Sequence, residues 1–216
     1  MNDSDIAPVT GPRRYSSARR ERQAEQTRTD ILMAATRLFA ERGYAGTTLA
    51  AVAAAADVAV ETVYAGFGSK KALLGAAMDV AIVGDTAPIP LFDRPEAHRI
   101  EALSPADRLP ALFTWIGGVY AGPVAGVWRA MLEAAANDPE VAGWCGEHER
   151  RRRSTLVDWL GANLDHLPDD AAIDQMWAVT SMEVFGKLTR ERGWTVGQWA
   201  QWMVGMLRVL APDLPR

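Results

Sequence analysis

The stretch TTLAAVAAAADVAVETVYAGFGSKKALL, residues 47–74, decides the fold. Its leading threonines, Thr47 or Thr48, can accept a hydrogen bond from free backbone amides and start a short, alanine-rich helix. Asp57 then occupies a turn, and the segment 59–65 has room for only about two helical turns. A helix this short is not stable alone, so neighbouring helices must hold it. Two short helices joined by a turn predict a helix-turn-helix unit, whose size suits the DNA major groove.

Longer helices are predicted on both sides of this unit. Upstream, apolar residues recur at three- and four-residue steps from Ile31 to Phe39, which predicts a helix ending near Gly43. Downstream, Ser69 is a candidate N-cap for a fourth helix that ends near residues 84–85. These helices should supply the hydrophobic core on which the two short helices pack.

The unit offers side chains that suit DNA. On its second helix, Val60 can contact a thymine methyl group, Thr62 can do the same or hydrogen-bond, and Glu61 can accept a hydrogen bond from cytosine N4. Glu61 has an alternative role as a first-turn acid that favours the helix dipole. Three more side chains are hydroxyl or ammonium donors and are predicted to hold phosphates: Thr48, Tyr64 and Lys70.

Many positions in this region match one known family in order and spacing. They are Arg28, Ile31-Leu32, Ala34-Ala35, Leu38-Phe39, Gly43-Tyr44, Thr47-Thr48, Val52-Ala53, Ala56, Val58, Thr62-Val63-Tyr64, Phe67, Ser69-Lys70 and Leu73-Leu74. On these residues the chain resembles the TetR (tetracycline repressor) family of transcriptional regulators. Looser matches at 137–142, 150–153, 180–184 and 190–194 extend the resemblance toward the C-terminus.

Two positions depart from the family pattern. The turn usually carries Gly where this chain has Asp57, but Asp tolerates a left-handed backbone, so the turn should survive. Ala50 stands where the family often has a basic residue that contacts phosphate, which predicts the loss of one backbone contact.

The resemblance implies an all-α fold, and 216 residues suit a small module joined to a larger domain. The expected parts are a flexible basic arm at 1–22, a helix-turn-helix DNA-binding domain at 23–72 and a helical effector-binding and dimerisation domain at 73–216. The net charge of −4 is distributed unevenly. Residues 11–75 hold ten Lys and Arg against six Asp and Glu, whereas 76–216 hold thirteen against nineteen, so the basic surface is N-terminal.

The expected arm is rich in arginine and otherwise polar. Its basic residues are Arg13, Arg14, Arg19, Arg20 and Arg22. They could contact phosphates or the minor groove, or they could be a solvated tail with no specific role, and only the salt dependence of binding separates these two readings.

Prolines at 88, 90, 95 and 105 interrupt the chain after the fourth helix, where the two domains are expected to separate. Helices should then start at 104–105, 138–139, 168–169 and Thr195. Aromatic and sulfur-containing residues on these helices lie where relatives of the family line a ligand cavity, and they suit a small lipophilic or aromatic effector: Trp115, Tyr120, Trp128, Met131 and Trp144. For each residue taken singly, plain core packing is the alternative.

Two later stripes suit dimerisation, because helices with wide apolar faces can pack against their copies in a four-helix bundle. One stripe ends in Thr155 and Trp159, and the other, on an expected helix from Ile173 to Leu188, includes Trp177, Thr180, Val184 and Leu188. The alternative is an ordinary intrachain core. A symmetric homodimer would place two recognition helices on one face of DNA and predict a palindromic operator.

The sequence lacks the parts of an enzyme. It holds no H-E-x-x-H, no nucleophile elbow and no P-loop, and its three histidines lie far apart, so we expect no catalysis, no cofactor and no metal site. A single cysteine and the lack of an apolar run of 18 to 20 residues predict a cytoplasmic protein without membrane spans. The expected function is a ligand-responsive repressor; the alternative is a DNA-binding protein of the same fold that is constitutive or controlled by a partner protein.

Overall fold

The computed structural model describes the backbone of residues 13–212 and the side chains of residues 18–212. All regular elements in this part of the chain are helices, which confirms the all-α prediction. In chain order they are α1 (Arg13–Arg42), α2 (Leu49–Ala55), α3 (Val60–Phe67), α4 (Lys70–Val83), η1 (Leu91–Asp93), α5 (Pro95–Glu101), α6 (Pro105–Val119), η2 (Tyr120–Val124), α7 (Ala125–Ala135), α8 (Pro139–Asn163), α9 (Asp170–Val179), α10 (Met182–Gly186), η3 (Lys187–Glu191) and α11 (Val196–Leu210).

Local capping explains the short helices of the N-terminal module. The Thr48 side chain accepts from the Ala51 amide at the start of α2, and Ser69 accepts from the Ala72 amide at the start of α4. Between α2 and α3, Asp57 adopts a positive φ of 53°, which confirms the left-handed turn. The sequence therefore sets the helix-turn-helix through side chains that satisfy exposed backbone amides.

The expected arm needs correction where it is described. Residues 13–22 continue α1 as one helix, whereas residues 1–12 lie outside the described residues. The segment 18–26 reads ARRERQAEQ, and Ala, Arg, Glu and Gln all have high helix propensity. Extending an existing helix costs far less than nucleating a new one, so a polar segment can continue a helix that it could not start.

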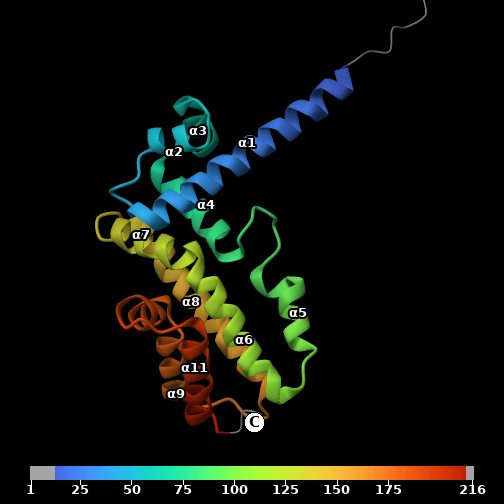
Figure 1. Ribbon diagram of the computed structural model, residues 1–216, viewed down its shortest axis with the longest axis vertical. Coiled ribbons are helices and arrows are strands. Elements are labelled where there is room, and N and C mark those ends of the chain that lie inside the picture. Colours follow the sequence, from blue (N-terminus) through green and yellow to red (C-terminus); the bar gives the residue numbers. More distant parts are fainter. Residues whose placement is uncertain (1–12, 213–216) are drawn as a thin grey trace, which may run out of the picture.

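The C-terminal part is a stack of helices below α1 in the view of Figure 1, in which α7 packs against α8 and α6 packs against α11. The helix-turn-helix lies at one end of this stack, and α9 and α11 lie at the other end. Three irregular segments interrupt the helices. The first is the π-helical turn η2, where Gly122 is non-helical, the second is the break between α9 and α10, and the third is the π-helical turn η3.

The break between α9 and α10 corrects the expected helix from Ile173 to Leu188. Helix α9 stops at Val179, and the Ser181 side chain accepts from the Val184 amide to start α10. Apolar residues at helical steps continue across the break, but Ser181 is a competing N-cap that ends one helix and starts the next.

Two hydrophobic cores result. The first joins α1 to α4 with α7 and the start of α8, and the second joins α6, α9, α10 and α11. The first core therefore spans both expected domains, and α4 itself crosses the expected boundary between residues 72 and 73.

One stretch of the described residues, Pro105–Ala135, passes a length-and-composition test for a membrane span, with a mean hydropathy of 1.2. This corrects the expectation that no apolar run is long enough. The stretch is α6, η2 and α7, which pack against α11, α8 and α1, and buried core helices pass the same test.

Candidate functional site

A groove of about 500 Å³ lies on the outer side of the helix-turn-helix, between the starts of α2, α3 and α4. It brings together four of the six predicted DNA contacts: Thr48, Val60, Tyr64 and Lys70. Glu61 and Thr62 do not line it, but both are exposed on α3. We call this feature the α2–α4 groove.

The groove residues are arranged to donate hydrogen bonds outward. Thr48 uses its oxygen to accept from the Ala51 amide, which leaves the hydroxyl proton for another acceptor. Tyr64 is 54% exposed. The Lys70 ammonium lies 4.2 Å from the centre of the Tyr44 ring, and partial burial lowers the pKa of Lys70 while Glu133 opposes that shift. A lysine held by cation–π contact at a helix start suits a phosphate oxygen.

Arg28 of α1 contacts the C-terminal end of α3. The Arg28 guanidinium stacks on Phe67, 4.5 Å from the ring centre, and donates to the Gly66 carbonyl at 3.2 Å. Because α3 has only eight residues, this contact helps to set the direction in which its exposed face points.

Replacing Tyr64 by Phe and Lys70 by Ala should each weaken DNA binding roughly tenfold on all sequences, since each removes a hydrogen bond to a charged phosphate. Lys70→Ala should also reduce the slope of log affinity against log salt by about 1 per protomer, whereas Tyr64→Phe should leave the slope unchanged. Gel shift on unrelated duplexes at several salt concentrations measures both effects. Lys187→Ala is the matched control, because Lys187 is an exposed lysine on η3. Unchanged DNA affinity of the two groove variants would refute the assigned roles.

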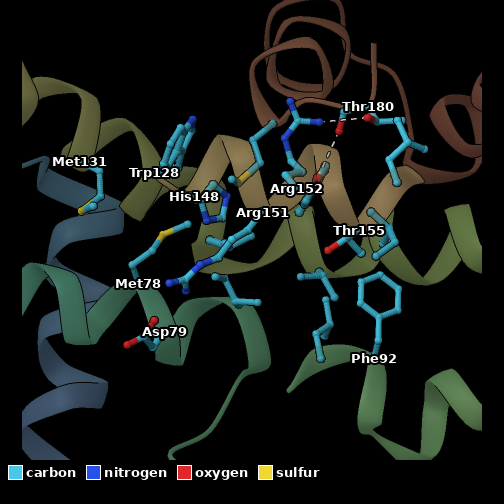
Figure 2. A pocket seen from close by; sticks show the side chains of 18 of the residues that line it. Met78, Asp79, Phe92, Trp128, Met131, His148, Arg151, Arg152, Thr155 and Thr180 are labelled. Atoms are coloured by element: carbon cyan, nitrogen blue, oxygen red, sulfur yellow. Dashed lines mark hydrogen bonds between the residues drawn. The ribbon is translucent and has the colours of Figure 1, made fainter. Parts of the chain in front are cut away.

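A larger cavity of about 820 Å³ lies between α4, α6 and α8 and is bounded by the η1 turn (Figure 2). We call it the central cavity. Of the five predicted effector residues, the structure places Tyr120, Trp128, Met131 and Trp144 on its wall. Trp115 is not on the wall, because its ring packs edge-on against Phe92, which itself lines the cavity.

Three of the six predicted dimer residues face this cavity: Thr155, Trp159 and Thr180. Trp177 is half-buried under the Arg152 guanidinium, 5.0 Å from the ring centre. Val184 and Leu188 are half-buried, and Leu188 packs on the second core. The proposed interface residues therefore do not form one continuous outer face.

Arg152 and Tyr120 hold the break between α9 and α10. Arg152 donates to the Trp177 carbonyl at 2.7 Å and to the Thr180 hydroxyl oxygen at 3.0 Å. The Tyr120 hydroxyl donates to the Thr180 carbonyl at 3.1 Å, and burial raises the pKa of Tyr120 to about 12, so the donor stays protonated. The hydrogen bond from Tyr120 to Thr180 thus connects η2 with the α9–α10 break at the cavity wall.

Sequence reasoning missed the polar groups of the cavity. Asp79 projects from α4, and His148 and Arg151 project from α8 on the facing wall (Figure 2). One signal could have found Asp79, since it is the only charged residue in the otherwise apolar run from Ala72 to Val83. In the arginine run 150–153, Arg150 and Arg151 pair with Glu147, and Arg152 pairs with Glu149.

The central cavity and the α2–α4 groove share structural elements. Helix α4 starts at the groove with Lys70 and lines the cavity with Met78, Asp79 and Ile82. Helix α7 carries cavity residues Trp128 and Met131 and also Glu133, whose carboxylate accepts from the Tyr44 and Ala45 amides at 2.7 and 2.9 Å. A third link is Lys71, whose ammonium pairs with Asp138 and Glu140 at the start of α8.

Comparison with known proteins supports this arrangement. Residues 31–77 match the family described as bacterial regulatory proteins, tetR family. No curated protein matches the sequence significantly. Among solved structures, the fold is similar to a putative TetR-family transcriptional regulator from Mesorhizobium loti MAFF303099, at 17% identity and a TM-score of 0.64, covering 88% of this chain and 96% of that chain.

Two ligand-bound structures are also similar. One is AibR in complex with isovaleryl coenzyme A and operator DNA, at 22% identity and a TM-score of 0.57, covering 82% of this chain and 95% of that chain. The other is the transcriptional regulator FadR from Bacillus subtilis in complex with stearoyl-CoA, at 17% identity and a TM-score of 0.58, covering 86% and 98%. At these identities the likeness shows a shared fold.

Proposed function

We propose that this chain, which is a TetR-family transcriptional regulator with a DNA-binding helix-turn-helix, is a repressor whose operator binding is controlled by a ligand in the central cavity. The observation that carries the proposal is the double role of α4. One helix supplies Lys70 to the groove and Met78, Asp79 and Ile82 to the cavity, so a ligand that moves α4 also moves the helix-turn-helix.

The size of the cavity supports a small-molecule effector. A volume of about 820 Å³ lies within the range of ligand sites, and its wall is mainly apolar and aromatic with a few polar groups. AibR and FadR, which share the fold, are each complexed with an acyl-CoA, and AibR also with operator DNA. These complexes support a fold that holds ligand and DNA at separate places.

The coupling free energy that such control requires between effector binding and operator binding is modest. An effector acts only if it binds the DNA-free conformation more tightly, and a coupling of about 1 to 3 kcal/mol lowers operator affinity roughly 5- to 150-fold. Displacement of α4, whose Lys71 pairs with Asp138 and Glu140 of α8, would change the position of α3 relative to its copy in a second subunit.

We propose a homodimer in the cytoplasm, built through α8 and the segment from α9 to η3. The proposed contacts between subunits are Trp177, Val184 and Leu188. Three further proposed contacts also line the central cavity: Thr155, Trp159 and Thr180. A two-fold symmetric dimer presents two α3 helices to successive major grooves, so its operator should be an inverted repeat. The match to the tetR family supports a regulator rather than an enzyme, and we propose neither a catalytic step nor a resident cofactor.

Selection of bound sequences from a randomised DNA pool tests the proposal, followed by gel shift on the enriched sequence at several salt concentrations. Enrichment of an inverted repeat, bound tightly and with a steep salt dependence, would support a dimeric sequence-reading regulator. Failure to enrich any sequence, with weak salt-sensitive binding only, would rule it out.

A further inference from the structure

We propose that the effector of the central cavity is a lipophilic cation whose positive group pairs with Asp79. The proposal rests on the proposed function and names the chemical class of the ligand. It adds a charge requirement to the apolar and aromatic surface, and it places that charge on α4.

The charges on the cavity wall single out Asp79. The Glu147 carboxylate is shared by Arg150 at 2.7 Å and by Arg151 at 3.0 Å. Arg152 pairs with Glu149 at 2.7 Å. Among the described residues, Asp79 has neither an ion pair within 4.0 Å nor a hydrogen-bond partner, although it lines the cavity. In the part of the chain that the structure describes, Asp79 is therefore the acid on the cavity wall without an ion pair.

The Asp79 side chain is exposed at the open cavity, and its surroundings disfavour the charged carboxylate only in part. Burial raises the pKa of Asp79, and the more distant positive charges of Arg151 and His148 act in the opposite direction. Burial also lowers the pKa of His148, which favours its neutral form, so it supplies little positive charge at neutral pH. A ligand cation beside Asp79 would favour the charged form of the carboxylate.

The rest of the wall suits the body of such a cation. Trp128 and Trp144 contribute indole rings to the cavity wall, and Met78 and Met131 contribute polarisable thioethers. The ring of His148 lies against the Trp128 ring with centroids 4.7 Å apart and the ring planes tilted by 38°. Its buried Nε2 has no hydrogen-bond partner among the described residues. Aromatic faces attract cations electrostatically, and a neutral imidazole nitrogen can hydrogen-bond to a ligand.

An anionic effector fits less well. It would have to draw Arg151 away from Glu147, and its charge would lie near the carboxylate of Asp79. Arg152 is already committed to Glu149, the Trp177 carbonyl and Thr180. The arginines of the wall are thus held by protein partners, whereas Asp79 is open to the ligand.

A matched pair of probes tests the sign of the charge. Tetraphenylphosphonium and tetraphenylborate have nearly the same size and shape but opposite charge. Their binding to the full chain is measured by isothermal titration calorimetry, with wild type, Asp79→Asn and the control Asp158→Asn, which changes an exposed acid on α8 that does not line the cavity. We expect wild type and the control to prefer the phosphonium. Asp79→Asn should bind it roughly tenfold or more weakly, because a charge-assisted contact is lost.

Equal affinity of wild type and Asp79→Asn for the phosphonium, a preference for the borate, or no binding of either probe would overturn the cation assignment. Operator binding, measured in parallel, separates this outcome from failure of the proposed function. If the borate binds and releases operator DNA, ligand control stands and the cation assignment falls. If the phosphonium binds through Asp79 and leaves operator affinity unchanged, the cation site stands and ligand control falls.

Discussion

Replacing Trp199 by Ala is expected to lower the free energy of unfolding by about 3 to 5 kcal/mol, the largest effect of any substitution considered for this chain. The Trp199 side chain is fully buried at the centre of the second core. Its ring packs against Phe185, Phe113 and Tyr120, with centroids 5.1, 5.8 and 5.9 Å away. Truncation would leave a large cavity among three aromatic rings that the surrounding helices cannot fill.

Urea denaturation measures this loss as a shift in the transition midpoint. Trp202→Ala is the matched control, because Trp202 lies one turn along α11, is only half-buried and contacts the Trp194 ring. Trp202→Ala should lower the free energy of unfolding clearly less than Trp199→Ala does. Similar losses for the two variants would contradict the view that the ring cluster around Trp199 holds the C-terminal domain together.

Gly126→Ala is expected to destabilise the protein by about 1 to 3 kcal/mol and to weaken DNA binding, since the new methyl group forces α7 away from α1. A Cβ atom at Gly126 would lie 2.7 Å from the Ala40 Cα and carbonyl oxygen, and backbone atoms cannot move aside alone. Ala40 lies close to the Gly43–Gly46 loop that Glu133 of α7 holds through the Tyr44 and Ala45 amides. Displacement of α7 at this contact should therefore also displace the helix-turn-helix.

The same change at Gly143 is the control, because no atom lies within 4 Å of the Cβ that would be added there on α8. Gly143→Ala should leave DNA affinity unchanged and raise stability by about 0.5 to 1 kcal/mol through lower backbone entropy in the unfolded chain. Thermal melts and gel shifts of both variants measure the contrast. A Gly126→Ala protein with wild-type stability and affinity would show that close α1–α7 packing is unimportant.

Local signals made the helix-turn-helix predictable from the sequence. Thr48 and Ser69 are N-caps as expected, Asp57 takes the left-handed turn, and α4 ends at a left-handed Gly84. Each of these positions is decided by hydrogen bonds or backbone conformations within a few residues, so the sequence alone contains the information.

Tertiary contacts decide the features that sequence reasoning missed. The break after Val179 is held by Arg152 and Tyr120, which are distant in sequence. Trp115 differs from Tyr120 as a cavity residue only because the η1 turn brings Phe92 against it. Helical periodicity finds an apolar stripe, but it does not tell whether that stripe faces a core, a cavity or a partner subunit.

The central claim is that occupation of the cavity and binding of DNA are coupled through α4, and operator affinity of Leu112→Trp tests it most directly. Leu112 lines the cavity from α6, so a larger ring there occupies ligand space without changing α4 itself. Leu103→Trp makes the same change at a position that does not line the cavity and is 38% exposed. On the selected operator, Leu112→Trp should bind roughly fivefold or more weakly than wild type, while Leu103→Trp binds normally. Wild-type operator affinity in a correctly folded Leu112→Trp protein would contradict the coupling.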